Sequence, residues 1–223
     1  MTMNKYERQQ EIVDRDRIAG KFVTIIGVGS IGRQVALMLA AMGFNLELID
    51  PDIVEEVNIA VQGYSYYDIG RSKVIITRED CLRAHKETEI GTSIKKFKRA
   101  HCAEPIPWVF CCVDSIAARA HIWKLLNKDV RFFVDGRMTA ESMRIITASS
   151  SKSKKYYPKT LFSAKEAQGG SCTAKSTFYC ASVAAGLMIA NFTKYLRNIP
   201  VEKDIMLNVL SSELLIYEEP DNG

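Results

Sequence analysis

The chain has 223 residues, of which 47% are hydrophobic and 25% are charged, and its formal net charge at pH 7 is +4. These values are ordinary for a globular protein and predict one sizeable core, built as a single domain over residues 1–223. The small net charge and the scattered basic residues do not favour nucleic acid as a partner.

The sequence gives no sign of a membrane segment or a secretory leader. No apolar stretch reaches the roughly 18 residues that a membrane helix needs. The polar opening MTMNKYERQQ lacks the apolar centre of a signal peptide. The six cysteines form no CxxC pair and no regular framework, which favours reduced thiols. We therefore expect a cytoplasmic protein.

The first elements predicted along the chain are a helical arm and a βαβ unit. Residues 5–19 are predicted to form a charged amphipathic helix that ends at Gly20, which makes residues 1–20 an N-terminal arm. A buried strand, an Ala- and Leu-rich helix and a second buried strand follow at 21–27, 30–42 and 45–50. Two strands joined by such a helix pair in parallel with a right-handed crossover.

The rest of the chain predicts further helices and strands. Helices are expected at 72–85, 115–127 and 176–196, and extended segments at 89–96, 108–113, 131–135, 142–149, 205–210 and 213–217. The polar, basic stretch 149–171 is interpreted as a long mobile loop. This order predicts an α/β fold with a Rossmann-like, mostly parallel sheet flanked by helices and with antiparallel C-terminal strands.

A glycine-rich loop, GVGSIG, follows the first buried strand. Gly27 permits a tight turn, Gly29 lets the backbone approach a phosphate, and Gly32 lets the helix pack against the strand. The helix that begins near Ser30 directs its amide dipoles at an anion. Asp50 ends the second strand 18 residues after Gly32, where a carboxylate can accept ribose hydroxyls. The sequence therefore predicts a nucleotide site, although the loop alone also suits a nicotinamide-dependent dehydrogenase.

Four further motifs narrow this choice. They are KYERQQ at 5–10, LIDPDIVEEVNIAVQ at 48–62, DIGRSK at 68–73 and CCVDSIAAR at 111–119. Together with the glycine loop, and in this order, they resemble the ThiF/MoeB family of ubiquitin-activating-type adenylyltransferases. The resemblance covers residues 5 to about 135 and extends weakly to the remainder.

The resemblance implies that the chain binds ATP and Mg2+ and adenylates the C-terminal carboxylate of a small ubiquitin-like or sulfur-carrier protein. Lys73 matches the family's phosphate-binding lysine, a point charge suited to the displaced pyrophosphate. Asp114 matches the acid that holds Mg2+, and Arg119 would orient that acid. The residues that the resemblance assigns to nucleotide binding are Gly27, Gly29, Ser30, Gly32, Asp50, Asp52, Asn58, Gln62, Lys73 and Arg119.

Two further assignments concern a partner subunit and a nucleophile. Arg8 matches an arginine that reaches the partner's ATP site in family dimers, so a homodimer is expected. Cys172 precedes a threonine within a stretch that resembles the family's crossover loop, here 151–175. A thiol near a helix N-terminus and beside Lys175 has a lowered pKa, which suits a thioester or persulfide role. A small loop cysteine is the alternative, whereas Cys111, Cys112 and Cys180 lie in apolar elements and are predicted to be core.

The chain departs from the family in two respects. The two CxxC pairs that bind structural zinc in many relatives are missing, so no zinc is predicted. Val61 stands in NIAVQ where the family carries a phosphate-binding arginine, and Arg71, Arg33 or Arg8 are the candidates to replace it.

Three alternatives to the adenylyltransferase remain open at this point. They are a tRNA-modifying dehydratase of the same superfamily, a nicotinamide-dependent oxidoreductase, and a scaffold that binds nucleotide without efficient turnover. The loss of an arginine at Val61 motivates the last of these.

Overall fold

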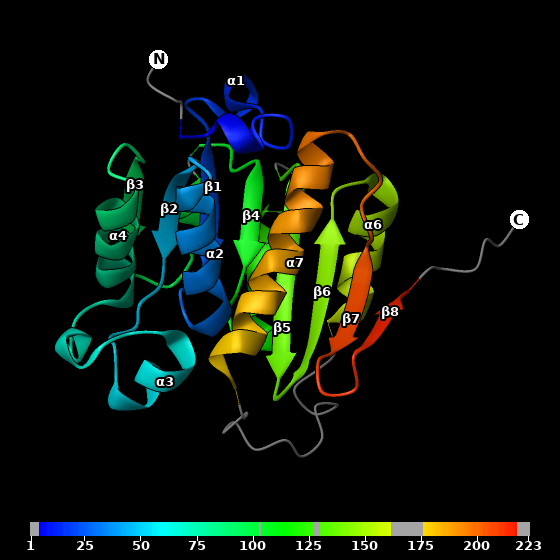
Figure 1. Ribbon diagram of the computed structural model, residues 1–223. Helices are drawn as coiled ribbons and strands as arrows, with labels where there is room; N and C mark the ends of the chain where they lie inside the picture. Colours follow the sequence, from blue (N-terminus) through cyan, green and yellow to red (C-terminus); the bar gives the residue numbers. More distant parts are fainter. Residues whose placement is uncertain (1–4, 103, 127–129, 162–175, 218–223) are drawn as a thin grey trace, which may run out of the picture.

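The computed structural model describes residues 5–102, 104–126, 130–161 and 176–217 (Figure 1). The strands are β1 (Phe22–Ile26), β2 (Asn45–Ile49), β3 (Ile90–Ser93), β4 (Trp108–Cys111), β5 (Phe132–Thr139), β6 (Ser142–Ala148), β7 (Asp204–Asn208) and β8 (Glu213–Ile216). The α-helices are α1 (Arg15–Ile18), α2 (Ser30–Ala41), α3 (Ile59–Gln62), α4 (Lys73–Ala84), α5 (Ile116–Leu126), α6 (Ser151–Tyr156) and α7 (Phe178–Leu196). Among the described residues, no helix has the length and apolarity required to cross a bilayer.

The described strands form one eight-stranded sheet in the order β3-β2-β1-β4-β5-β6-β7-β8. β1 to β5 pair in parallel, and β5 to β8 pair in antiparallel fashion. This confirms the predicted fold class. Ile26 of β1 pairs with both Ile49 and Cys111, so the carboxyl ends of three neighbouring strands meet at one edge, which we call the carboxyl edge. Open α/β sheets bind their ligands at this edge.

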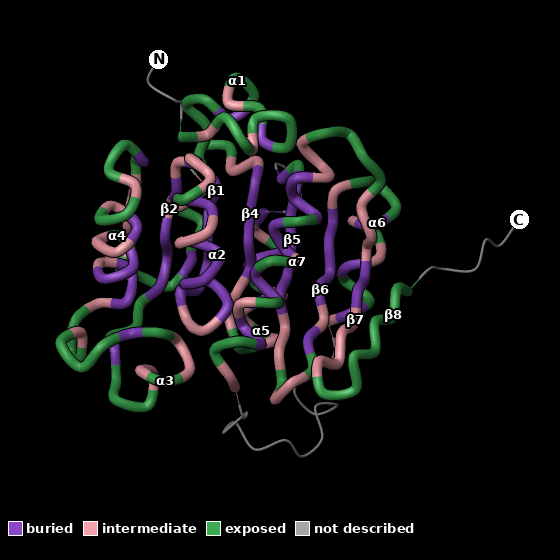
Figure 2. Tube along the Cα trace, viewed as in Figure 1, coloured by how far each residue is buried: buried purple, intermediate pink, exposed green. Residues whose placement is uncertain are grey.

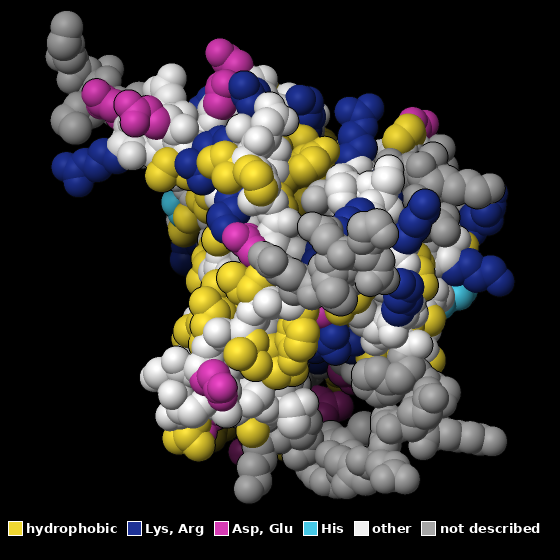
Figure 3. All heavy atoms as spheres, turned by 90° about the vertical axis from the view of Figure 1, so that its right-hand side faces the viewer, with side chains coloured by type: hydrophobic (Ala, Val, Ile, Leu, Met, Phe, Trp, Pro, Cys, Tyr) yellow, Lys and Arg dark blue, Asp and Glu magenta, His cyan; other side chains and the backbone are white. Residues whose placement is uncertain are grey.

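Helices cover both faces of the sheet. On one face, α2 and α7 pack side by side, and Phe192 of α7 contacts the rings of Phe44 and Trp108 (Figure 1). On the other face, Trp123 of α5 packs against Phe133 and Tyr157. Figure 2 shows the central strands buried between these layers and the edge strand β8 exposed along its length. Figure 3 faces that side and shows hydrophobic and basic side chains on its surface.

Two local predictions were wrong. The arm is not one helix over 5–19 but a 3-10 turn, Glu7–Gln9, followed by α1. α1 is a separate helix because the backbone of Asp14 is extended. The Asp14 side chain caps α1 by accepting a hydrogen bond from the amide of Asp16 across 3.0 Å.

The stretch predicted as a loop over 149–171 contains structure in its first part. Ser150 and Ser153 cap α6 reciprocally, and a 3-10 turn, Tyr157–Thr160, follows. Tyr157 is fully buried against α5, which ties this polar segment to the core. The remainder, 162–171, lies outside the described residues.

Candidate functional site

The glycine loop connects β1 to α2 at the carboxyl edge. Gly27 has a φ of +89°, and a β-carbon there would lie 2.8 Å from the carbonyl oxygen of Cys112. A β-carbon on Gly32 would lie 1.8 Å from the carbonyl oxygen of Gly27. Only glycine fits either position. Gly29 has no such contact and precedes Ser30, the first residue of α2, so the backbone here is open to a ligand.

The carboxylate of Asp50, which follows β2, fixes this loop by a hydrogen bond. The buried Asp50 accepts a hydrogen bond from the amide of Val28 across 2.7 Å and another from the amide of Asp52 across 2.8 Å. Burial raises the pKa of Asp50, and these two amide bonds counter the rise. Each carboxylate oxygen keeps a further lone pair, so Asp50 can hold the loop and still accept a ribose hydroxyl.

Lys73 is linked to Asp50 through Asp52. It is the first residue of α4 and is only 6% exposed. Its Nζ lies 3.2 Å from Oδ2 of Asp52, whose side chain is mostly exposed. A buried ammonium beside one exposed carboxylate can still attract a phosphate.

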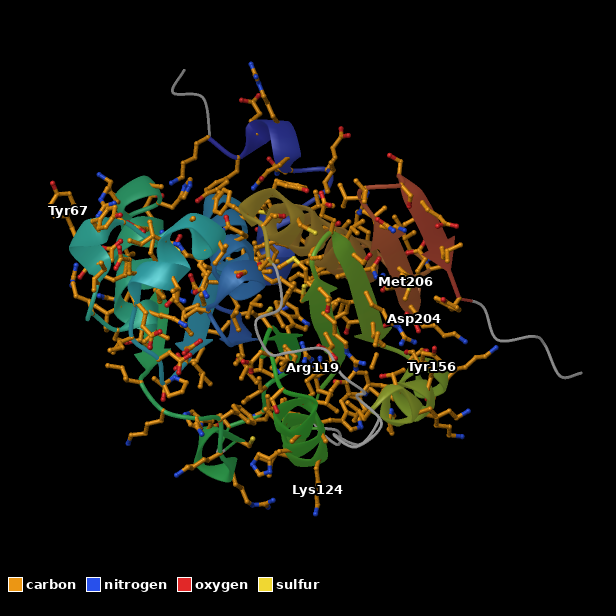
Figure 4. The ribbon with its side chains drawn as sticks, turned by 90° about the horizontal axis from the view of Figure 1, so that it is seen from below. Tyr67, Arg119, Lys124, Tyr156, Asp204 and Met206 are labelled. Atoms are coloured by element: carbon orange, nitrogen blue, oxygen red, sulfur yellow. The ribbon has the colours of Figure 1, made fainter. Side chains whose placement is uncertain are left out.

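Asp114 follows β4, which pairs with β1 on the side opposite to β2. Its neighbour Cys112 joins the turn to β1 by donating its amide to the carbonyl of Ile26 across 2.8 Å. The Asp114 side chain is exposed and has no hydrogen-bond partner among the described residues. Arg119 of α5, labelled in Figure 4, donates from Nη1 to the backbone carbonyl of Asp114 across 2.9 Å. Arg119 therefore holds the turn that carries Asp114, and its own carboxylate partner is Asp135, 2.7 Å away.

Gln62 and Asn58 lie beside the loop in different roles. A β-carbon on Gly29 would lie 3.9 Å from both terminal atoms of the Gln62 side chain, and Gln62 Oε1 is buried without a hydrogen-bond partner in the described structure. Such an atom fits a donor on a ligand. Asn58 Oδ1 accepts the amide of Glu55 across 2.9 Å, so Asn58 caps the short 3-10 turn Glu56–Asn58.

Two residues that the sequence did not single out also adjoin this site. Ser72 immediately precedes Lys73, and its Oγ is buried without a partner among the described residues. Ser176 precedes α7, and its hydroxyl lies 3.4 Å from that of Ser30, so the N-termini of α2 and α7 meet. The available signal was a serine as the first residue of a predicted helix in each case.

Arg8 is not brought to the site within this chain. It is exposed in the turn Glu7–Gln9, and this arm lies at the end of the sheet opposite to the glycine loop (Figure 1). Arg33 is also unavailable to replace the arginine missing at Val61. Its buried guanidinium donates to Asp80 across 2.7 Å and to the carbonyl of Gly63 across 2.9 Å. Arg71 is exposed and paired with Glu79.

The cysteine predictions divide into those inside and outside the described structure. Cys111 and Cys180 are fully buried, as predicted, and Cys112 is partly buried. Cys172 lies outside the described residues, as does most of the stretch predicted as a crossover loop.

In the described residues, no cluster of three or more His, Cys, Asp or Glu side chains could hold a metal ion.

Comparison with known proteins identifies the family. The model of the ThiF family matches residues 6–220, nearly the whole chain. The chain belongs to the ThiF family. Relatives of this ThiF-family chain include ubiquitin-like modifier-activating enzyme 5 of Caenorhabditis elegans, 26% identical over 152 residues, and that of Drosophila sechellia, 29% identical over 147 residues. The matches cover 61% and 58% of this chain but 36% of each relative, so the chain spans little more than a third of their length.

Solved structures show the same fold at lower identity. PaaA superposes with a TM-score of 0.73 at 20% identity, over 96% of this chain and 82% of its own. Escherichia coli MccB, in a structure with succinimide, superposes with a TM-score of 0.77 at 17% identity, over 97% of this chain and 72% of its own. Another MccB structure, described as a microcin C7 biosynthetic enzyme in complex with N-formylated MccA, gives a TM-score of 0.76 at 17% identity, over 96% and 72% of the two chains.

Proposed function

We propose that this ThiF-family chain is an ATP-dependent adenylyltransferase that activates the C-terminal carboxylate of a small ubiquitin-like or sulfur-carrier protein. One observation carries the proposal: Lys73 pairs with Asp52, which bonds through Asp50 to the glycine loop, and the exposed Asp114 follows β4, the strand that pairs with β1 next to that loop. A site with a cation, a hard oxygen ligand and a helix N-terminus suits a nucleoside triphosphate.

The reaction needs binding, orientation and charge stabilisation from the protein. A carboxylate oxygen of the partner's tail attacks the α-phosphorus of ATP, the bond from that phosphorus to the β-bridging oxygen breaks, and pyrophosphate leaves with the electron pair. The product is an acyl adenylate. The amides at the start of α2 and the ammonium of Lys73 stabilise the charge that develops on the phosphates.

The chemistry of Asp114 fits Mg2+. Magnesium in nucleotide sites commonly takes one or two protein carboxylates and completes its coordination with phosphate oxygens and water. The exposed side chain of Asp114 has no competing partner among the described residues. Bound there, the ion would neutralise charge on the phosphates, while Arg119 keeps the turn in place.

A homodimer accounts for Arg8. The arm that carries Arg8 lies at the end of the sheet opposite to its own glycine loop, so Arg8 would have to act in the site of a second subunit. We also propose that Cys172 acts after adenylation. Its thiolate attacks the acyl carbonyl, the bond to AMP breaks, and a thioester forms as AMP leaves. The chain would work as a single adenylation domain in the cytoplasm.

ATP–pyrophosphate exchange tests this function. Exchange should depend on Mg2+ and on an added small protein that ends in glycine. Lys73→Met should reduce it about 100-fold because a cation aimed at the phosphates is lost. Cys172→Ala should leave exchange intact and remove any thioester to the partner protein. Exchange that is equally fast without a carrier protein would contradict the proposal.

A nucleotide-binding scaffold is the second candidate, and the surroundings of Val61 favour it. Val61 lies in α3, while Arg33 is committed to Asp80 and Gly63 and Arg71 to Glu79. The site in one chain therefore has less positive charge than the family pattern implies. Tight ATP binding without exchange, in the presence of a panel of carrier proteins, would favour the scaffold.

A further inference from the structure

Asp135 is a buried carboxylate that the proposed chemistry does not use. It lies in β5, and its side chain is fully buried. Arg119 Nε donates to its Oδ1 across 2.7 Å, and Arg137 Nε donates to its Oδ2 across 2.8 Å. The hydroxyl of Tyr157 also donates to Oδ2, across 3.0 Å. Two arginines on different elements therefore share one carboxylate.

Arg119 links this carboxylate to the Asp114 turn. Its Nη1 donates to the Asp114 carbonyl across 2.9 Å, and its Nη2 donates to the Gly136 carbonyl across 3.1 Å. A guanidinium is planar, so fixing its Nε at Asp135 also fixes the directions of the other two bonds. The position of the Asp114 turn thus depends on Asp135.

Arg137 links the same carboxylate to a second segment. Its Nη1 and Nη2 donate to the backbone carbonyl and the hydroxyl of Thr160, across 2.8 and 3.0 Å. Thr160 ends the 3-10 turn that starts at Tyr157, and its hydroxyl donates to the Tyr157 carbonyl across 2.8 Å. In the sequence, Thr160 stands just before the stretch that contains Cys172.

We propose that Asp135 is a positioning residue that places Asp114 through Arg119 and places Thr160 through Arg137. The inference rests on the proposed function, since it concerns the acid that would hold Mg2+ during adenylation. Asp135 carries one negative charge between two buried or nearly buried guanidiniums, whose side chains are 6% and 13% exposed. Without that charge the two cations repel each other, and both linked segments lose their anchor.

The first test needs no activity. Hydrogen–deuterium exchange of the ligand-free protein should increase about tenfold or more at the amides of residues 118–119, which bond back to Ser115, and of residues 159–161 in Asp135→Asn. Tyr157→Phe is the matched control, because it removes one hydrogen bond to Asp135 but leaves both arginine links. It should increase exchange near Tyr157 and leave 118–119 unchanged. Unchanged exchange at 118–119 in Asp135→Asn would overturn the inference whatever the protein's function.

The second test measures the consequence for the metal. In Asp135→Asn, the Mg2+ concentration that half-saturates ATP binding should rise about tenfold, as is usual when a group that orients a metal ligand is lost. ATP binding without Mg2+ should change little, and Tyr157→Phe should match the wild type. An unchanged Mg2+ dependence in a folded Asp135→Asn would overturn the positioning role. If the wild type binds no ATP, the proposed function fails. The hydrogen–deuterium exchange result still tests whether Asp135 positions the Asp114 turn.

A third variant covers the case in which Asp135→Asn does not fold. Arg119→Lys keeps the charge beside Asp135 but cannot make the three directed bonds of the guanidinium. It should shift the Mg2+ dependence in the same direction. An unchanged Mg2+ dependence in folded Arg119→Lys would overturn the inference.

Discussion

Charged side chains are paired differently in the antiparallel half of the sheet and at the carboxyl edge of the parallel half. In the antiparallel half, Asp204 is fully buried and accepts two hydrogen bonds from Arg144, across 2.9 and 2.6 Å. It also accepts the hydroxyl of Tyr156 across 2.5 Å, and Figure 4 shows these two residues on β7 and α6. At the carboxyl edge of the parallel half, Asp114 is exposed and Lys73 meets one solvent-exposed carboxylate across 3.2 Å. Charges paired with one another stabilise the fold, whereas charges with spare capacity are available to a ligand.

The largest expected effect is on chemistry at the carboxyl edge. Asp114→Ala should lower Mg2+-dependent ATP–pyrophosphate exchange by roughly 1000-fold, because the acid assigned to the metal is lost. The midpoint of thermal unfolding should stay within about 1 °C, since an exposed side chain without a partner adds little stability. Exchange at the wild-type rate would remove Asp114 from the mechanism.

The opposite outcome is expected in the antiparallel half. Arg144→Met should reduce the free energy of unfolding by about 3 kcal/mol, because it leaves the buried carboxylate of Asp204 without its cation. Exchange per folded molecule should not change. The control is Arg71→Met, whose exposed pair with Glu79 contributes about 1 kcal/mol or less. Equal losses of stability in the two variants, measured by urea unfolding, would show that burial does not distinguish these pairs.

Local motifs explain which parts of the site were predictable. The roles of Gly27 and Gly32 follow from a short run of sequence, and the structure shows the close contacts that require glycine. The brace from Asp50 to Val28 was not predictable, since it joins the end of β2 to the loop after β1 and depends on how the two strands lie together. The carboxylate partner of Arg119 was also missed, because Asp135 is 16 positions away and meets it only across the folded sheet.

The polar segments were the hardest parts of the fold. α6 is short and rich in Ser and Lys, so its composition resembles that of a loop. Its position depends on Tyr157, which packs against Trp123 of α5, and on the pair between Asp204 and Tyr156. None of these contacts is local in sequence. The apolar strands and α7 were predicted closely because their hydrophobic patterns alone determine their burial.

A gain of charge at the carboxyl edge would sharpen the comparison. Val61→Arg restores a cation in α3, beside the described part of the site, and should raise the rate of exchange about tenfold. Val61→Met, which adds length without charge, is the matched control and should leave the rate unchanged. A lower rate with arginine, at unchanged ATP affinity, would mean that another group already occupies this position.

The smallest effect concerns the reactivity of two buried cysteines, Cys111 and Cys81. Burial raises the pKa of the Cys111 thiol to about 12, and that of Cys81 also to about 12. About one such thiol in ten thousand is therefore ionised at pH 8, and both should resist iodoacetamide until the protein unfolds. Raising the pH from 8 to 10 increases the ionised fraction about 100-fold, but labelling should increase less than this because burial also limits access. Rapid labelling of Cys111 at pH 8, detected by mass spectrometry, would show that β4 is open next to Asp114.

A crystal structure with Mg2+ and a non-hydrolysable ATP analogue tests the central claim most directly. The account predicts that the triphosphate lies against the amides at Gly29 and Ser30, with Lys73 on one side and a metal ion held by Asp114 on the other. A nucleotide whose phosphates lie away from the glycine loop, or a metal ion that Asp114 does not ligate, would contradict it.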